Sequence, residues 1–177
     1  MSGHTLRQVF AIATSLQDTA RSLNLADPNR SDTVSVSAIA AYDALITQPE
    51  LINTTRRLFV DGYFALAVEE GFKQVNNTVK TKANQSIDGA SLMRTVLSPK
   101  SPLLRLNRLK TQSQRDQQQG YMDILAGCMT GIRNPRAHEH QYLDDVDIAL
   151  ELLVLANHLL KMINQATRAR KRAQTTE

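Results

Sequence analysis

Apolar residues recur every three or four positions along most of the chain, a spacing that predicts helices rather than strands. The first predicted helix spans residues 4–24, and the polar loop ADPNRSD follows it. Residues 33–47 begin with the strand-like alternation TVSVS but continue as AIAAYDALI. We predict a helix there, packed separately from the rest as an N-terminal accessory piece.

A second group of helices is expected between residues 49 and 97. Pro49 suits the first turn of a helix, and the following pattern runs to Lys80 with a break at Asp61-Gly62. The expected buried positions of this run are Leu58, Phe59, Phe64, Leu66, Val68, Phe72, Val75 and Val79. A short helix is predicted at 89–97, with Asp88 near its N-terminus.

The C-terminal half holds a long connection and two further helices. Residues 98–113 contain two prolines and four basic residues, so an irregular connection is expected there. A helix is predicted at 113–132, and the last one begins near Asp144, with Asp147 as its capping-box partner. Together these elements predict an all-α, up-and-down helical bundle.

This pattern divides the chain into three parts. We predict an N-terminal helical extension at 1–47, a helical domain at 48–167 and a basic flexible tail at 168–177. The composition agrees with helices, because seven Gly and five Pro are few turn formers for a protein of many short strands.

Cysteine and hydropathy indicate the compartment. The single cysteine, Cys128, cannot form a disulfide within the chain, which is typical of a reducing compartment. There is no secretory signal pattern and no apolar run of transmembrane length. We therefore expect a cytoplasmic protein that does not enter a membrane.

Basic residues give a net charge of +4 and gather in two segments. The first segment holds Lys100, Arg105, Arg108, Lys110 and Arg115, and the second holds Arg168, Arg170, Lys171 and Arg172. This charge permits binding to nucleic acid. A solvated face and a frayed tail explain the two segments equally well.

The stretch RNPRAH, residues 133–138, is the main candidate site. At about 100° per residue, a regular helix would place Arg133 and His138 about 140° apart around its axis. Pro135 lacks an N–H and disfavours a helical conformation for Asn134, so we predict a kink or stop that brings the two side chains together.

Arginine and histidine together can cleave RNA without a metal. His138 would donate or accept the proton at the 2′-hydroxyl and the leaving 5′-oxygen. Arg133 would hold the charge that builds on the phosphate, and Asn134 would orient the histidine or the phosphate. The structural alternative is that both basic residues only neutralise carbonyls at a helix C-terminus.

Four ordered segments resemble the HEPN superfamily, in its Ymh-type branch from prophages and defence islands. They are RLFVDGYFALAVEEGFKQVNNTVK, DGASLMRTVL, QQGYMDILAGCMTGIRNPRAHE and ALELLVLANHLLKMI, within residues 50–165. RNPRAH resembles the R-x4–6-H motif of that superfamily, with the polar residue after arginine.

The resemblance implies a helical bundle that forms a homodimer, with the two motifs facing each other. It also implies a metal-independent endoribonuclease that needs no cofactor and acts as a toxin or abortive-infection effector against phage. An antitoxin or a larger defence complex would be a further partner. Arg133, Asn134 and His138 take the catalytic positions. The alternative is a non-catalytic scaffold or sensor that binds a nucleotide or a partner protein.

Several neighbouring residues are secondary candidates. Arg136 is expected to be exposed and to contact the RNA backbone. His140 would assist His138, and Lys73, with Glu69 and Glu70, would lie near the motif or on a solvated face. His138, Glu139 and His140 supply too few ligands to predict a metal site.

Three further possibilities are less favoured. His158 is expected to be a core or interface histidine, and Cys128 a small buried hydrophobic residue. A helix-turn-helix DNA-binding regulator is disfavoured because no basic recognition helix stands out.

Overall fold

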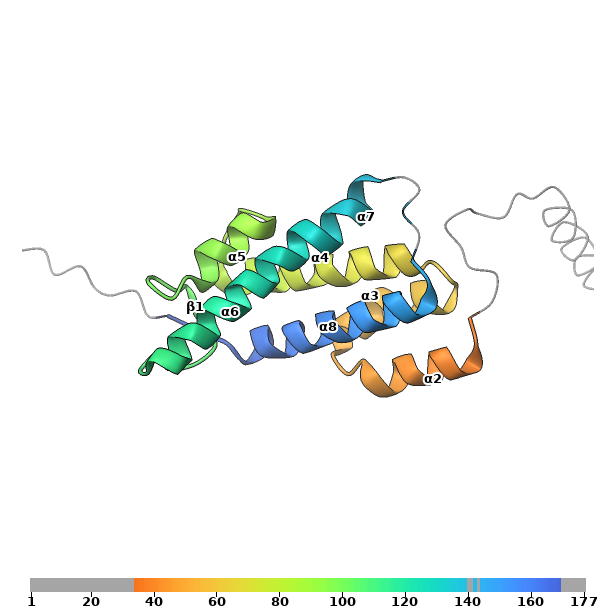
Figure 1. Cartoon of the computed structure of the whole chain (residues 1–177), viewed down its shortest axis with the longest axis horizontal. Coiled ribbons are helices and arrows are strands. Elements are labelled where there is room, and N and C mark those ends of the chain that lie inside the picture. The colour runs from red at the N-terminus through yellow and green to blue at the C-terminus, as the bar shows by residue number, and fades with distance from the viewer. Residues whose placement is uncertain (1–33, 140–141, 143, 170–177) are drawn as a thin grey trace, which may run out of the picture.

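Helices packed side by side make up the part of the chain that the computed structural model describes, residues 34–139, 142 and 144–169 (Figure 1). The prediction of an all-α bundle is confirmed. The predicted helix at 4–24 and His140 lie outside the described residues. Within those residues, no helix is long and apolar enough to cross a membrane.

The described residues form helices, one π-helical turn and two short strands, with a longer connection between α5 and α6. In chain order the helices are α2 (Val36–Leu45), α3 (Pro49–Val60), α4 (Phe64–Ala83), α5 (Gly89–Leu97), α6 (Gln112–Cys128), the π-helical turn η1 (Met129–Arg133), α7 (Asn134–His138) and α8 (Val146–Gln165). The strands are β1 (Leu104–Arg105) and β2 (Thr167–Arg168).

The predicted break between α3 and α4 is confirmed at Asp61-Gly62. Gly62 adopts a φ of 82°, a left-handed conformation that glycine enters without steric cost. Not every buried position was predicted correctly, because Leu66 is 42% exposed. Leu66 lies about 200° around α4 from the buried Val68, so it faces away from the core.

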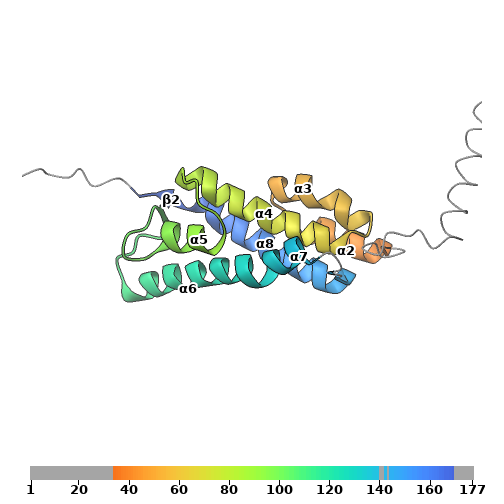
Figure 2. The same cartoon turned by 90° about the horizontal axis from the view of Figure 1, so that it is seen from above.

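Helix α4 runs through the centre of the bundle, with α3 and α8 against it (Figure 2). Gly71 is the point of closest packing. A Cβ atom at this position would lie 3.0 Å from Leu153 Cδ2 of α8 and 3.2 Å from Leu51 Cδ1 of α3. The absence of a side chain therefore lets three helices approach one another at one level of the core.

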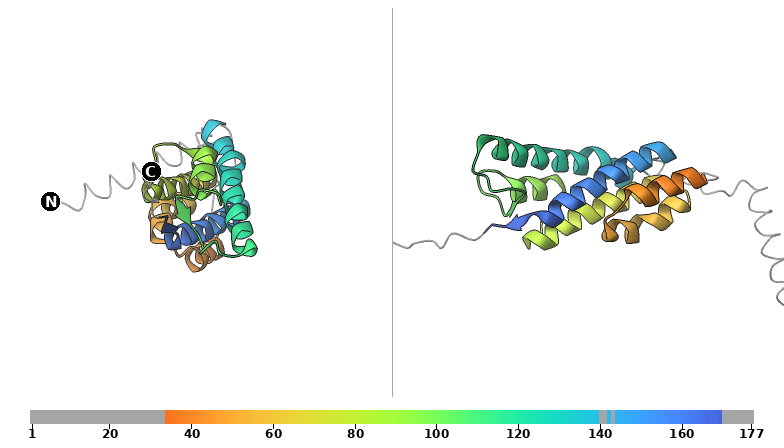
Figure 3. Two further views of the ribbon diagram at one scale, coloured as in Figure 1. Left: turned by 90° about the vertical axis from the view of Figure 1, so that its left-hand side faces the viewer. Right: turned by 90° about the horizontal axis from the view of Figure 1, so that it is seen from below.

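The expectation that residues 33–47 pack separately is wrong. Helix α2 lies alongside α8, as Figure 3 shows, and Tyr42 and Ile46 are each 1% exposed. A hydrogen bond of 2.7 Å joins the hydroxyl groups of Tyr42 and Thr55, and burial raises the pKa of Tyr42. The apolar face of α2 thus belongs to the main core.

The start of α8 differs by one residue from the prediction. Asp145 is the N-cap, and its Oδ1 accepts a hydrogen bond of 2.8 Å from the N–H of Ile148. Asp144 is unavailable for capping because both of its carboxylate oxygens bind Arg136. The predicted capping box with Asp147 does not form, since Ile148 occupies the position three residues after the cap.

The irregular connection expected between α5 and α6 is confirmed, and it pairs with the end of the chain. Strands β1 and β2 are antiparallel, with Leu104 opposite Arg168 and Arg105 opposite Thr167. Arg168, expected to begin a tail, is therefore held against the bundle. This strand pair lies at one end of the molecule, and α7 lies toward the other (Figures 1 and 2).

Candidate functional site

The helix carrying the motif does not stop at Pro135, which corrects the expected kink. Asn134 has helical angles, φ −62° and ψ −43°, and α7 continues to His138. The irregularity lies upstream instead, in the π-helical turn η1, where the Asn134 N–H bonds to the Met129 carbonyl. The chain leaves the helical conformation only at Glu139.

The π-helical turn explains how the proline is accommodated. Proline is tolerated in the first turn of a helix, and Pro135 falls there because η1 resets the hydrogen-bond pattern before α7 begins. The Ile132 carbonyl accepts a hydrogen bond of 2.8 Å from the Arg136 side chain. Such single π turns are frequent at functional sites.

Asn134 and His138 lie four residues apart on α7, so they share one face of that helix. The structure therefore brings these two candidates together, and His138 is exposed to solvent. On regular helical geometry Arg133 is offset by about 100° from Asn134 and by about 140° from His138. Because α7 stays helical through Pro135, no kink brings Arg133 and His138 together, contrary to the prediction.

Arg133 lies partly inside the bundle rather than on its surface. Its Nε is buried and has no hydrogen-bond partner within the described part of the chain. A buried N–H without an acceptor is costly, and such groups mark places where a ligand is bound or strain is retained. The positive charge of Arg133 also helps to lower the pKa of Asp88.

A polar cluster joins α4 to the N-terminus of α5, close enough to Arg133 for its charge to act on Asp88, and the sequence did not reveal it. Asn76 is 4% exposed, and its Nδ2 donates to Asp88 Oδ1 at 2.8 Å while its Oδ1 accepts from the Gly89 N–H at 2.9 Å. Lys80 binds the other Asp88 oxygen at 2.8 Å. Hydrogen bonds from Lys80 and Asn76, with the charge of Arg133, lower the pKa of Asp88.

One feature of the sequence indicates this cluster: a polar residue, Asn76, stands at a position on the buried face of α4. Asn76 follows Phe72 at helical spacing, where an apolar residue is expected. Because Asp88 stays ionised to lower pH than an ordinary aspartate, it keeps a negative charge near Arg133.

Arg136 is not exposed, contrary to the prediction. Its side chain is 4% exposed, and its Nε and Nη2 donate to the two oxygens of Asp144 at 2.6 and 2.7 Å. Its guanidinium also lies 4.6 Å from the centre of the Tyr142 ring. Arg136 thus fastens α7 to the segment that leads into α8, and its charge is already neutralised.

Lys73 is similarly engaged on α4, which contacts both η1 and α7. Its ammonium group lies 2.8 Å from Glu69 and 2.7 Å from Glu70, and hydrogen bonds to Glu69 and Glu70 raise the pKa of Lys73. Glu69 is the more enclosed of the two carboxylates, with 13% of its side chain exposed. The role of Lys73 in binding substrate stays a prediction.

His158 and Cys128 do not extend the site. His158 is exposed, not buried, and its Nε2 lies 2.7 Å from the Tyr121 hydroxyl. Cys128 is buried as expected, and burial raises the pKa of its thiol to about 11, so it is no nucleophile at neutral pH. Over the described ranges, no three His, Cys, Asp or Glu side chains are grouped to hold a metal.

The fold and the site together define an all-α bundle whose Arg-Asn-x3-His motif follows a π-helical turn. The chain belongs to the family described as "Protein of unknown function (Hypoth_ymh)", whose family model matches residues 46–163, about two thirds of its length. The predicted resemblance to Ymh-type proteins is confirmed by this match. No curated protein and no solved structure matches the chain.

Proposed function

We propose that this protein is a metal-independent endoribonuclease of the HEPN type, acting in the cytoplasm as a toxin or abortive-infection effector. The observation that supports this proposal most is the burial of Nε of Arg133 together with the exposure of His138. Among the described residues, Arg133 retains a buried donor without a partner, while the imidazole of His138, five positions further along the chain, is exposed. A phosphate oxygen would supply the missing acceptor for the guanidinium.

The chemistry uses the chain's own groups. The 2′-hydroxyl of RNA attacks the adjacent phosphorus, and the bond from phosphorus to the 5′-oxygen breaks. The 2′-hydroxyl loses its proton and the leaving 5′-oxygen gains one; His138 carries out one of these transfers, and water exchanges the proton at the other oxygen. Arg133 stabilises the negative charge that develops on the phosphate. Asn134 shares the face of His138 on α7 and so can orient the substrate or the imidazole.

A homodimer is part of this proposal, because Arg133 and His138 are offset on their own helix. The exposed face of α6 and η1 offers a surface for it. Gly120, Ile124, Gly127 and Gly131 lie on one stripe of that face by helical spacing, and all four are exposed. Cβ atoms added at the three glycines would meet nothing within 4 Å. Small residues allow a second helix to approach closely, and Ile124 adds apolar area.

Replacing Gly127 by Ala should weaken the dimer while strengthening the isolated fold. Alanine in an exposed helix interior is favoured over glycine by about 0.5–1 kcal/mol. In a close helix contact, however, the added methyl group separates the two chains. We expect the dissociation constant, measured by sedimentation equilibrium, to rise about tenfold, which is about 1.4 kcal/mol.

The matched control is Gln119→Ala, an exposed position of α6 outside the stripe. It also raises helix propensity, but it should leave the dissociation constant unchanged. A Gly127→Ala variant that dimerises as tightly as the unmodified protein would place the interface elsewhere.

The function is tested by the products that the purified protein forms from RNA in EDTA. We expect fragments that end in a 2′,3′-cyclic phosphate and begin with a 5′-hydroxyl, and no cleavage of the same sequence carrying 2′-O-methyl groups. Absence of cleavage, or fragments ending in a 3′-hydroxyl, would contradict the proposal. A stable dimer that cleaves no RNA would favour the scaffold or sensor instead.

A further inference from the structure

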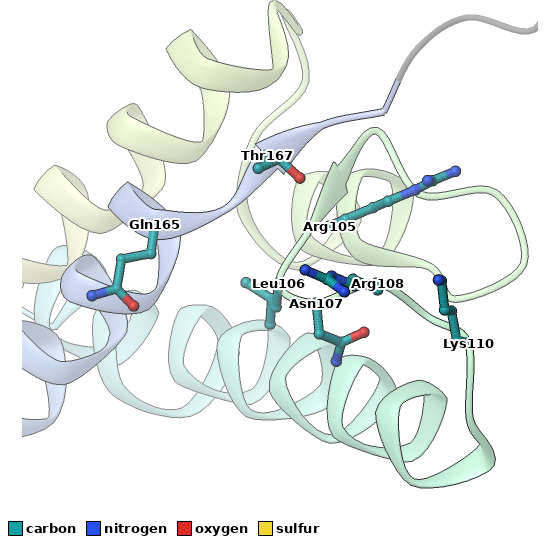
Figure 4. A pocket seen from close by; sticks show the side chains of 7 residues that line it. All are labelled: Arg105, Leu106, Asn107, Arg108, Lys110, Gln165 and Thr167. Carbon is teal, nitrogen blue, oxygen red and sulfur yellow. The ribbon is translucent and has the colours of Figure 1, made fainter.

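A basic surface lies at the end of the bundle away from α7, and the proposed active site does not use it. It is a hollow of about 420 Å³, lined by Arg105, Leu106, Asn107, Arg108, Lys110, Gln165 and Thr167. Figure 4 shows Arg108 near the middle of the lining, with Arg105 and Lys110 to its right and Gln165 to its left. These residues come from the connection before α6 and from the end of α8 with β2.

The strand pair creates this surface from two distant basic segments. Arg105 pairs with Thr167, Leu104 pairs with Arg168, and the Ala169 N–H donates to the Leu103 carbonyl at 2.9 Å. The segments look like a solvated face and a frayed tail when each is considered alone. Pairing places the cations of the first beside Arg168 of the second, and the sequence continues from Ala169 with Arg170, Lys171 and Arg172.

The backbone of this loop is held rigidly by buried and half-buried amides. Gln118 is 0% exposed, donates to the carbonyls of Leu97 and Leu104 at 2.9 and 3.0 Å, and accepts from the Leu106 N–H at 2.9 Å. Asn107 donates to the Gln114 carbonyl at 2.8 Å and accepts from the Leu109 N–H at 2.8 Å. The loop is therefore organised before any ligand arrives.

The same network fixes an unfavourable backbone conformation. Leu109 has a φ of 54°, which a branched side chain rarely adopts, and it separates Arg108 from Lys110. Arg115 supports the turn through the Leu109 and Lys110 carbonyls at 3.3 and 3.4 Å. Strained residues that their surroundings hold in place are typical of ligand sites.

The three cations nevertheless remain available. Arg105, Arg108 and Lys110 are exposed, and none of them takes part in an ion pair with any described residue. This contrasts with Arg136 and Lys73, whose charges are neutralised by carboxylates. The seven described lining residues include no acidic group that would repel an anion.

We infer that this surface binds the phosphodiester backbone of single-stranded RNA and holds it at a distance from Arg133 and His138. The lining offers cations and amides for phosphate oxygens but no aromatic ring on which a base could stack. Recognition is thus electrostatic and independent of sequence. The choice of RNA rests on the proposed function, whereas the presence of an anion site does not.

The test measures RNA binding separately from cleavage. Fluorescence anisotropy would follow a labelled single-stranded RNA bound to the His138→Ala variant, with and without Arg105→Gln and Arg108→Gln. We expect the double substitution to weaken binding about tenfold and to reduce the slope of log K against log salt by about 1.4, or about 0.7 per lost contact. The control variant, Arg56→Gln with Arg57→Gln, removes the same number of positive charges from α3. It should leave the affinity for RNA and the salt slope unchanged.

The outcomes separate this inference from the proposed function. Suppose that the wild-type protein cleaves RNA and that both double variants bind RNA as tightly as the His138→Ala protein does. The surface is then not an RNA site, and the ribonuclease proposal stands. If no RNA is cleaved but only the Arg105→Gln/Arg108→Gln variant loses binding, the surface is supported and the ribonuclease proposal fails. If this variant loses binding only to vesicles of anionic phospholipid, the inference is overturned.

Discussion

Replacing Arg136 by Ala should lower the free energy of unfolding by about 3–5 kcal/mol, the usual cost of removing one partner from a buried ion pair. Both side chains of the pair are almost fully enclosed, at 4% for Arg136 and 3% for Asp144. The substitution leaves the Asp144 carboxylate buried without a partner and the Ile132 carbonyl without its side-chain donor. Urea denaturation at neutral pH measures the loss directly.

A surface pair of the same geometry provides the control. Arg56 donates from Nε and Nη2 to the two oxygens of Asp43 at 2.7 and 2.8 Å, but both side chains are 45% exposed. Because water screens this pair, Arg56→Ala should cost far less than Arg136→Ala. Equal losses for the two variants would show that burial of the Arg136 pair does not matter.

A second control separates the charge from the packing. Replacing both partners, as Arg136→Met with Asp144→Leu, removes the buried charges together and should recover much of the stability lost by Arg136→Ala. If the double variant is as unstable as the single one, the contribution of Arg136 comes from its contacts with Ile132 and Tyr142.

Helical spacing and turn residues were sufficient to predict the described helices other than α7. The break at Gly62, the short helix after Asp88 and the irregular connection before α6 are all local features, written in neighbouring residues. The prediction that α2 packs separately was wrong, because the spacing of apolar residues within a helix does not indicate which other helices it packs against. Tyr42 reaches Thr55 across thirteen positions, and no local pattern indicates that contact.

The site residues were harder to predict, for a physical reason. Whether a charged residue is free or neutralised depends on partners that the chain brings in from elsewhere. Arg136 meets Asp144 eight positions later, whereas Arg105 and Arg108 meet no carboxylate in the described structure. Charge in the sequence therefore located the basic segments, but only the fold separates structural cations from available ones.

Pro135 illustrates a different limit. The steric rule for proline is correct for a regular helix, yet the chain inserts the π-helical turn η1 just before it. The extra residue moves the irregularity upstream and lets Asn134 stay helical. Because a π turn depends on the packing of a whole segment, local propensity does not anticipate it.

Replacing His138 by Ala should lower the rate of RNA cleavage about 100- to 10,000-fold, the usual contribution of a general acid or base. Replacing Arg133 by Met should lower it about 100- to 1,000-fold, the usual cost of removing one donor that stabilises transition-state charge. His138 supplies the proton transfer and Arg133 the charge that stabilises the transition state. Cleavage of a defined RNA under single-turnover conditions measures both effects. His158→Ala is the matched control, since this histidine is also exposed but lies on α8 beside Tyr121, and its rate should stay unchanged.

The stability of the Arg133→Met variant distinguishes a functional role of Arg133 from a structural one. The buried Nε of Arg133 has no acceptor among the residues that the structure describes. A buried unsatisfied donor costs about 1–3 kcal/mol, part of which Met removes while keeping much of the side-chain volume. The Arg133→Met protein should therefore be as stable as the unmodified protein or more so, although its activity is lost. Such an exchange of stability for activity is characteristic of functional sites. A variant that loses stability and activity together would instead assign Arg133 to the fold.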